Sequence, residues 1–326
     1  MPTADLHKFS FREGVYFISE PRAYQHPEEA YDRQYGNDRI ELETYRTEGM
    51  ALLELCGEYG IPDSGPVLEI GCGTGRLSLS LVLSGGLTEI LITDASPVFC
   101  SITSQKLASL DAPTPKTSMA VLLSEDLDRL LPESYALVIM RSVLHHVADI
   151  PKFLRDCARI LVPGGLLLCE EPCQEGYLLM GAMTLMVPDL LQAKGIVLSS
   201  EQMHRVREFV DTMQFYARRD VDKSSAEDKH LFRPDELMRL GNLSHMEMHC
   251  FANRTFGDIR KRNETLPSNY FEAFYFNYLK YCMSWDDELL QVFSEHVRKY
   301  WDYFSCLAFQ NALPYTYSTF LWRKLA

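Results

Sequence analysis

The feature that most constrains the fold is a regular alternation of short apolar runs with stretches of helical spacing between residues 67 and 169. Five runs have the length and composition of buried strands, and a helical segment or a turn separates each from the next. Strands that alternate with helices at this spacing form a parallel sheet with helices on both of its faces. The sequence therefore predicts a doubly wound α/β fold, with strands at residues 67–70, 89–93, 117–123, 135–140 and 166–169.

Composition narrows the class of protein. The chain has 326 residues and a formal net charge of −13, without a basic block that could neutralise phosphates, so we expect no nucleic-acid partner. Its most apolar stretch, residues 177–187, is shorter than the ~20 residues that span a membrane, and the N-terminus has no basic segment followed by an apolar one. Nine scattered cysteines indicate reduced thiols, and no second pair completes a zinc site with Cys169 and Cys173. We therefore predict a soluble cytoplasmic protein without a metal centre.

A glycine-rich turn follows the first predicted strand. Gly71, Gly73 and Gly75 stand in the segment GCGTGR, where a strand ends and a helix begins, so a ligand could touch the backbone there. A dinucleotide-binding turn requires glycine at its sixth position, which here is Arg76, and this disfavours a nicotinamide oxidoreductase. Asp94 ends the next strand, where a carboxylate can accept hydrogen bonds from a ribose diol.

Five segments together resemble the class I S-adenosylmethionine-dependent methyltransferases. The segment LEIGCGTG at residues 68–75 is similar to the first motif of that family, and DAS at 94–96 to the acidic end of its second strand. The segment SEDL at 124–127 stands where the family contacts adenine, although Leu123 replaces an aspartate that many members carry just before it. YALVIMRSVLHHV at 135–147 resembles the fourth strand with its turn, and LVPGGLLL at 161–168 resembles the entry to the fifth strand.

The resemblance implies a Rossmann-like methyltransferase fold with a mostly parallel, seven-stranded sheet, S-adenosylmethionine as cofactor and S-adenosylhomocysteine as product. The backbone of the glycine turn would bind the methionyl end, and the carboxylate of Asp94 would hold the ribose hydroxyls. Glu69 would bind the ammonium group or orient the turn, or its carboxylate is simply satisfied by nearby N–H groups. The residues implied at the cofactor are Glu69, Gly71, Cys72, Gly73, Gly75, Asp94, Ala95, Ser124, Glu125 and Arg141, the last through its backbone.

A catalytic base is needed only where the acceptor must lose a proton. His145 and His146 follow the fourth strand and are the candidates for this base or for orienting the acceptor. Paired histidines in such a turn also serve as packing and hydrogen-bonding groups, and this alternative stays open for both. Glu170 and Glu171, after the fifth strand, are further candidates, one to line the pocket and the other to cap a helix.

The chain is longer than the minimal fold of the family. We expect an N-terminal helical lid at 1–50, with Tyr31 and Tyr35 over the cofactor or packed on the sheet, and the α/β core at 51–175. Two helical insertions, at 176–240 and 257–310, would form a cap, and the last two strands would lie at 241–256 and 311–326. The second insertion holds more aromatic residues than one helix can bury on a single face. Those aromatic residues could build the core of the cap, a homodimer interface or the wall of an apolar acceptor site.

Three functions are compatible with these motifs. The first is O-, N- or C-methylation of a small molecule in biosynthetic or secondary metabolism, by in-line displacement at the methyl carbon, which the acidic surface and the apolar insertions favour. The second is methylation of a protein, which needs an open groove. The third is a non-methylating reaction in a fold that retains the cofactor. Release of S-adenosylhomocysteine would separate the third from the others.

Overall fold

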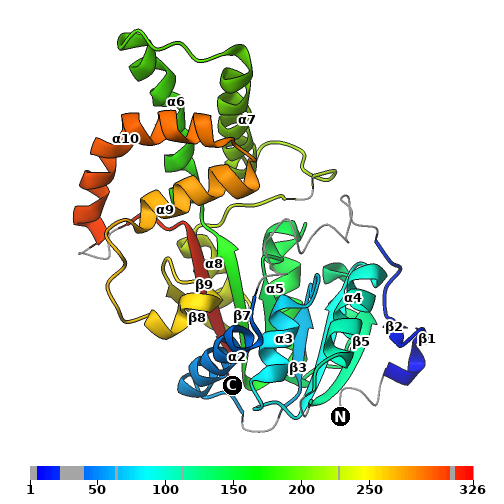
Figure 1. The fold of residues 1–326 in the computed structure, drawn as a ribbon. Helices are drawn as coiled ribbons and strands as arrows, with labels where there is room; N and C mark the ends of the chain where they lie inside the picture. Colours follow the sequence, from blue (N-terminus) through cyan, green and yellow to red (C-terminus); the bar gives the residue numbers. More distant parts are fainter. Residues whose placement is uncertain are drawn as a thin grey trace. The chain divides into compact units, whose positions relative to one another are not determined.

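The computed structural model describes residues 6–22, 40–62, 65–111, 114–226, 228–308 and 313–325 (Figure 1). The chain folds into two compact units, each made of separate stretches of sequence. An α/β unit contains the residues up to 171 together with 234–260 and the residues from 318 onward. A helical unit contains residues 172–233 and 261–317.

The α/β unit is built on one mixed sheet. Its central strands β3 (Val67–Ile70), β4 (Glu89–Asp94), β5 (Lys116–Val121), β6 (Tyr135–Arg141) and β7 (Leu161–Pro172) are parallel. The strands β8 (Met246–Phe251) and β9 (Tyr317–Lys324) form an antiparallel pair that extends the sheet beyond β7. Nearly every side chain of β3 and β6 is buried, as expected for strands covered on both faces. The predicted doubly wound α/β fold is confirmed.

The predicted number of strands was wrong. Within the described residues the sheet has nine strands, in the order β1-β2-β5-β4-β3-β6-β7-β9-β8, instead of seven. The two additional strands, β1 (Ser10–Arg12) and β2 (Val15–Phe17), form a hairpin, and β2 pairs in parallel with the edge strand β5. Each is three residues long, too short to show the alternation of apolar and polar residues by which a strand is recognised in sequence. These strands lie in the segment for which we expected a helical lid, whereas Tyr31 and Tyr35 lie outside the described residues.

Helices cover both faces of this sheet. The helices α2 (Leu42–Glu58), α3 (Arg76–Leu83) and α4 (Pro97–Ala108) share one face, and α5 (Ile150–Ile160) lies on the other (Figure 1). The face changes because the strand order reverses at β3 while the crossovers stay right-handed. The helices begin where their sequence provides caps: the side chain of Ser96 accepts from the N–H groups of Val98 and Phe99, and that of Asp149 accepts from Lys152 N–H.

The helical unit has a hydrophobic core of its own. It contains α6 (Gln174–Ala193), α7 (Ser200–Ala217), α9 (Tyr270–Asn277), the π-helical turn η7 (Tyr278–Cys282) and α10 (Asp287–Ala308). Its interior is rich in aromatic rings, including Phe209, Phe271, Tyr275, Trp285 and Phe293. The hydroxyl groups of Thr184 and Tyr275 meet in this core at 2.6 Å. Many of the aromatic residues of the second insertion therefore build the interior of this unit, while Tyr281 and Tyr303 are exposed.

The α/β unit also contains α8 (Pro234–Leu243), which precedes β8 in the chain, and the 3₁₀ turn η6 (Phe256–Lys261), which follows it. Gly241 of α8 packs so closely against the indole of Trp322 that a Cβ there would lie 2.6 Å from the ring. No helix in the described part of the chain is both long and apolar enough to cross a membrane.

Candidate cofactor and catalytic site

The glycine turn between β3 and α3 has a backbone that side chains cannot easily adopt. Gly71, Gly73 and Gly75 have φ angles of +72°, +50° and +91°, in the left-handed region that favours glycine. A Cβ on Gly71 would lie 2.4 Å from a methyl group of Val143, and one on Gly75 would lie 3.0 Å from the hydroxyl of Thr103. The turn therefore packs closely against Val143 and Thr103 at the carboxyl ends of the central strands, where ligands bind in folds of this class.

Asp94 ties this turn to the next strand. Its Oδ2 accepts from Gly73 N–H and its Oδ1 from Ser96 N–H, each at 2.9 Å. The carbonyl of Gly73 in turn accepts from the Thr103 hydroxyl at 2.9 Å. The structure thus brings together Asp94 and the glycine turn, two of the predicted cofactor elements. Ala95, the next predicted residue, accepts from Arg22 N–H through its carbonyl at 2.9 Å.

Glu69 is fully buried just before the turn. Among the described residues neither of its carboxylate oxygens makes a hydrogen bond of normal geometry. Burial raises the pKa of Glu69 to about 8; the nearby Ser78 hydroxyl lowers this pKa in part, and the charge of Asp94 raises it. A fully buried carboxyl group that lacks a well-formed hydrogen bond is suited to accept one from a cationic ligand. The glycine turn and this carboxyl group fit the amino-acid end of S-adenosylmethionine.

Ser124 and Glu125 lie in the 3₁₀ turn η4 (Ser124–Arg129) that follows β5. Because Asp94 pairs with Val121 in the sheet, this turn begins close to the end of β4. The Ser124 hydroxyl donates to Glu125 Oε2 at 2.9 Å, and Arg22 Nη2 lies 3.4 Å from Glu125 Oε1. Burial alone would raise the pKa of Glu125, but hydrogen bonds from its own backbone and from Ser124 outweigh it and lower that pKa.

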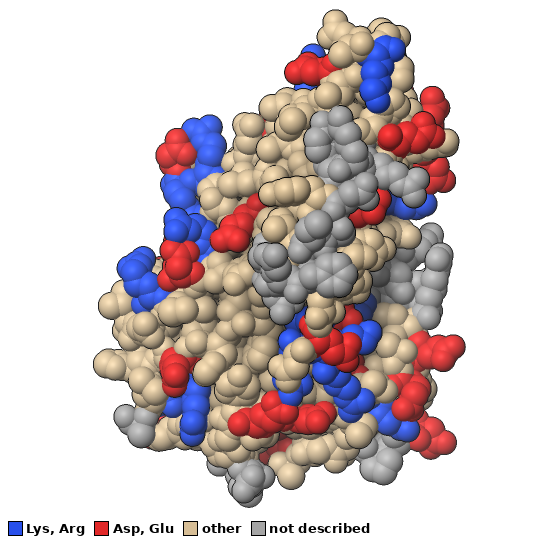
Figure 2. Space-filling model, turned by 90° about the vertical axis from the view of Figure 1, so that its left-hand side faces the viewer, with Lys and Arg blue, Asp and Glu red and all other residues tan. Residues whose placement is uncertain are grey.

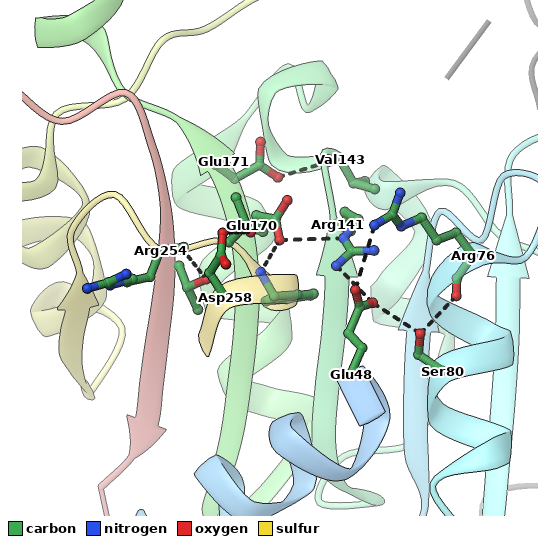
Figure 3. Close-up of polar contacts among 12 residues, drawn as sticks. Glu48, Arg76, Ser80, Arg141, Val143, Glu170, Glu171, Arg254 and Asp258 are labelled. Atoms are coloured by element: carbon green, nitrogen blue, oxygen red, sulfur yellow. Dashed lines mark hydrogen bonds and ion pairs between the residues drawn. The ribbon is translucent and has the colours of Figure 1, made fainter. Parts of the chain in front are cut away.

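His145 and Glu171 form a buried pair at the ends of two adjacent strands. His145 lies in the 3₁₀ turn η5 (Leu144–His146) after β6, and its Nδ1 is 2.6 Å from Glu171 Oε2 at the end of β7. Glu171 Oε1 accepts from the N–H groups of Val143 and Leu144 at 2.9 and 2.6 Å (Figure 3). One carboxylate therefore holds both the histidine ring and the turn that carries it. A histidine whose Nδ1 is bound in this way presents Nε2 as a proton acceptor.

His146 has a different environment from His145. Its backbone N–H donates to the carbonyl of Val143 at 2.9 Å, and its ring centroid is 4.0 Å from that of His145. His145 is the one of the two whose ring nitrogen is held by Glu171. The carboxylate that holds His145 is fully buried.

A second group of charged side chains lies on the α2 and α3 side of the same strand ends (Figure 3). Glu48 of α2 places Oε1 at 2.9 Å from Arg141 Nη2 and Oε2 at 3.7 Å from Arg76 Nη2. Arg141 Nε is 3.5 Å from Glu170 Oε2, which also accepts from the N–H of Phe256. The guanidinium group of Arg141 lies 5.0 Å from the centre of the Phe256 ring.

Sequence reasoning named Arg141 for its backbone and missed its side chain, as well as Glu48 and Arg76. Glu48 stands among the buried residues of α2, on a face that is otherwise almost entirely apolar. A carboxylate at a buried helix position must be paired, and this was the one signal in the sequence that could have identified it. Its partners could not be identified, because they belong to α3 and to β6.

Comparison with known proteins identifies the central part of the chain. Residues 68–167 match the family model described as a methyltransferase domain. A polyketide synthase-nonribosomal peptide synthetase from Aspergillus clavatus is 38% identical over 110 residues, which are 32% of this chain and 3% of that protein. A ubiquinone biosynthesis O-methyltransferase from Caulobacter sp. strain K31 is 29% identical over 128 residues, 39% of this chain and 49% of that enzyme. The chain thus spans half or less of the length of these relatives.

The fold also has a counterpart among solved structures. A protein from Galdieria sulphuraria assigned as a sarcosine dimethylglycine methyltransferase superposes with a TM-score of 0.51 at 15% sequence identity. The superposition covers 91% of this chain and 98% of that one. At this identity the likeness shows the fold alone.

Proposed function

We propose that this protein, whose residues 68–167 form a class I S-adenosylmethionine-dependent methyltransferase domain, methylates a small-molecule acceptor in biosynthetic metabolism. The observation that carries the proposal is the buried His145–Glu171 pair. The turn bearing His145 packs against the glycine turn, because a Cβ on Gly71 would collide with Val143. The proton acceptor and the cofactor-binding backbone therefore share one end of the sheet.

The protein's contribution is to hold the reactants and to accept a proton. S-adenosylmethionine, when bound, supplies an electrophilic methyl group that an acceptor attacks in line with the carbon–sulfur bond, leaving S-adenosylhomocysteine. Holding the reacting groups in this geometry can account for ~7–11 kcal/mol of barrier lowering. The proton released by the acceptor passes to His145 Nε2, and Glu171 stabilises the resulting imidazolium.

A positioned base favours an acceptor that has a proton to lose. We therefore propose a hydroxyl group or an acidic carbon as the methylated atom, in preference to a neutral amine. The names of the relatives, a ubiquinone biosynthesis O-methyltransferase and a polyketide synthase, support an acceptor from small-molecule biosynthesis. The formal charge of −13 supports a small neutral acceptor over a nucleic acid.

The helical unit lies outside the matched methyltransferase domain. We propose that the helical unit, with its exposed rings Tyr281 and Tyr303, contributes acceptor selectivity or a homodimer contact. Analytical sedimentation of wild type and of the Tyr281→Ser/Tyr303→Ser variant separates these two roles. A wild-type dimer that becomes a monomer in the variant supports the homodimer contact. A monomeric wild-type protein whose acceptor preference changes in the variant supports selectivity.

The first test combines binding with turnover. We expect S-adenosylmethionine and S-adenosylhomocysteine to bind in calorimetric titrations, and NAD not to bind. With catechol and with an acetoacetyl thioester as probe acceptors, we expect release of S-adenosylhomocysteine from at least one. His145→Ala should lower that rate by ~10²–10⁴-fold while leaving S-adenosylhomocysteine affinity within about twofold.

A matched control is His204→Ala, which removes an exposed histidine of α7 and should change neither quantity. Equal rates for wild type and His145→Ala would contradict the catalytic assignment. Binding without any release of S-adenosylhomocysteine would favour a non-methylating reaction. Methyl transfer to protein substrates alone would favour the protein methyltransferase.

A further inference from the structure

A cavity of about 400 Å³ lies between α4, β5 and the β1–β2 hairpin, which are neighbours at one edge of the α/β unit (Figure 1). This volume falls within the range of small-molecule sites. The residues of β5 that line it are Thr117, Ser118 and Met119, whereas the predicted cofactor residues Ser124 and Glu125 follow the carboxyl end of that strand. The cavity is therefore distinct from the proposed cofactor and catalytic site.

The wall of this cavity combines apolar side chains with residues that carry hydroxyl groups. Val82 and Met119 are buried members of the hydrophobic core, and Ser104 and Ser118 are among the hydroxyl-bearing residues beside them. None of the described residues that form the wall is charged. An ion would lose its water there without meeting an opposite charge, so the wall suits a neutral, largely apolar molecule with a hydroxyl or carbonyl group.

An exposed aromatic ring belongs to the same wall. Phe11 of β1 is 58% exposed, and the centre of its ring lies 4.6 Å from that of Tyr16, which also lines the cavity. A flat ring bound in the cavity would remove part of the Phe11 ring from water and contact an aromatic pair. The wall therefore favours an aromatic ligand.

One face of α4 borders the cavity. Ser104, Leu107 and Ala108 are spaced by three and four residues, so they share a face of the helix, and all three line the cavity. Gln105 does not line the cavity and is exposed. Because a ligand would touch three positions of one helix, its binding would restrain α4 against β5.

A neighbouring face of α4 holds the glycine turn. The hydroxyl of Thr103 donates to the carbonyl of Gly73 at 2.9 Å, and the ammonium group of Lys106 donates to the carbonyl of Thr74 at 2.9 Å. These two residues alternate along the helix with those that line the cavity. The same helix thus connects the cavity with the turn proposed to bind the cofactor.

We propose that this cavity binds a neutral aromatic molecule with a hydroxyl or carbonyl group, and that the bound molecule holds α4 where Thr103 and Lys106 fix the glycine turn. The effect on the turn rests on the proposed function, because it takes S-adenosylmethionine or S-adenosylhomocysteine as the ligand there. A molecule that restrains α4 lowers the cost of ordering the turn, so the two ligands bind with positive cooperativity. Each then raises the affinity of the other by the same factor.

The experiment uses 2-naphthol, which is uncharged at pH 7, as the probe. Calorimetric titrations of the full chain measure its dissociation constant with and without saturating S-adenosylhomocysteine, and the reverse pair of titrations measures that of S-adenosylhomocysteine. We expect 2-naphthol to bind, and each ligand to tighten the other by about fivefold. The anion 2-naphthoate, which has the same ring system, should bind at least about tenfold more weakly than 2-naphthol.

Ala108→Trp fills the cavity from an exposed position at the end of α4. It should weaken 2-naphthol at least about tenfold, leave S-adenosylhomocysteine alone within about twofold, and abolish the cooperativity. Gln105→Trp adds the same indole outside the cavity, and this control should behave as wild type. Phe11→Ala removes the exposed ring and should weaken 2-naphthol about threefold or more, which decides the matter if Ala108→Trp does not fold.

Failure of 2-naphthol to bind wild type would overturn the inference. Binding that neither Ala108→Trp nor Phe11→Ala weakens would also overturn it, since the probe would then lie elsewhere, for example in the acceptor site. Equal affinities for S-adenosylhomocysteine with and without 2-naphthol would overturn the role of α4. If 2-naphthol binds as expected but S-adenosylhomocysteine does not bind at all, the proposed function fails while the new site stands.

Discussion

Glu69 shows how burial changes the chemistry of a single carboxyl group. In the unfolded chain its pKa has the ordinary value of 4.5, and in the folded protein burial raises that pKa to about 8. Below pH 4.5 both states hold the proton, so Glu69 contributes no pH dependence. Between pH 4.5 and 8 the unfolded state has lost the proton that the folded state keeps, and stability falls as pH rises. Above pH 8 the dependence on Glu69 ends.

Glu69→Gln should therefore stabilise the ligand-free protein at alkaline pH. We expect its free energy of unfolding to exceed that of wild type by on the order of 2 kcal/mol at pH 8, and the difference to shrink toward pH 5. Urea unfolding at a series of pH values measures the free-energy difference at pH 8 and its decrease toward pH 5. Glu247→Gln, an exposed change on β8, is the control, and a constant difference between Glu69→Gln and wild type across the series would contradict the assignment.

Glu171 illustrates how one side chain serves two purposes at the residue scale. Its two oxygens accept from the backbone of the η5 turn and hold the ring of His145. Because the carboxylate is fully buried, the loss of one of these contacts leaves a buried polar group with neither a protein partner nor water to bind. The geometry of the proposed base therefore depends on the strand β7 as much as on the histidine.

At the scale of elements, the β3–α3 connection depends on a close approach that only glycine permits. Gly71→Ala combines a left-handed backbone with a Cβ 2.4 Å from Val143, so we expect a loss of ~3 kcal/mol in stability and weaker binding of S-adenosylhomocysteine. Gly85→Ala has a similar φ of +74° but open space around the Cβ, so it should cost only ~1–2 kcal/mol and leave binding unchanged.

The double variant Gly71→Ala/Val143→Ala separates crowding from backbone strain. Removing the Val143 methyl groups relieves the collision, so the double variant should recover part of the stability lost in Gly71→Ala. Thermal unfolding and calorimetry provide both readouts. Losses in Gly71→Ala and Gly85→Ala of equal size would show that the contact with Val143 is unimportant.

The β1–β2 hairpin shows what an element gains from its neighbours. Its strands are too short to be stable alone, but Ile18 and Ser19 donate their N–H groups to the carbonyl of Val121. The Ser19 hydroxyl accepts from Leu123 N–H at 2.9 Å, just before the predicted adenine contacts. This hairpin therefore extends the sheet at the edge where the turn η4 begins.

At the scale of the whole molecule, the chain passes between its two units four times. Each unit is made of separate stretches and has its own hydrophobic core, so neither can be removed by a simple truncation. Two of the three tryptophans report on different cores: Trp322 is fully buried in the α/β unit and Trp285 is 3% exposed in the helical unit.

Saturating S-adenosylhomocysteine should stabilise the α/β unit selectively. At 100 times the dissociation constant, the gain is about 2.7 kcal/mol for the unit that binds the ligand. In Trp285→Phe/Trp301→Phe the tryptophan fluorescence comes from Trp322 and follows the α/β unit, and we expect the ligand to raise the unfolding midpoint. In Trp301→Phe/Trp322→Phe the fluorescence comes from Trp285 and follows the helical unit, and we expect the ligand to shift the midpoint less. Identical shifts in the two variants would show that the units unfold as one cooperative body.

Much of the α/β unit was predictable because its signals are local. The glycine turn and the strand end at Asp94 are each read within a few residues, and the alternation of strands and helices determined the class of fold. The Pro-Gly-Gly segment, expected as a turn into the fifth strand, lies inside β7, which begins at Leu161. The caps at Ser96 and Asp149 are local in the same sense. The strands β1 and β2 escaped prediction because three residues cannot establish a period.

The sequence by itself thus determined the strand–turn–helix proposed to bind the cofactor and the candidate histidines that follow the fourth strand of the core. Only the tertiary structure decided that His145 pairs with Glu171, because the two residues are 26 positions apart and meet through the parallel pairing of β6 with β7. The same pairing sets Arg141 beside Glu170, and the packing of α2 supplies Glu48. Such contacts depend on strand order and helix packing, which no local sequence pattern encodes.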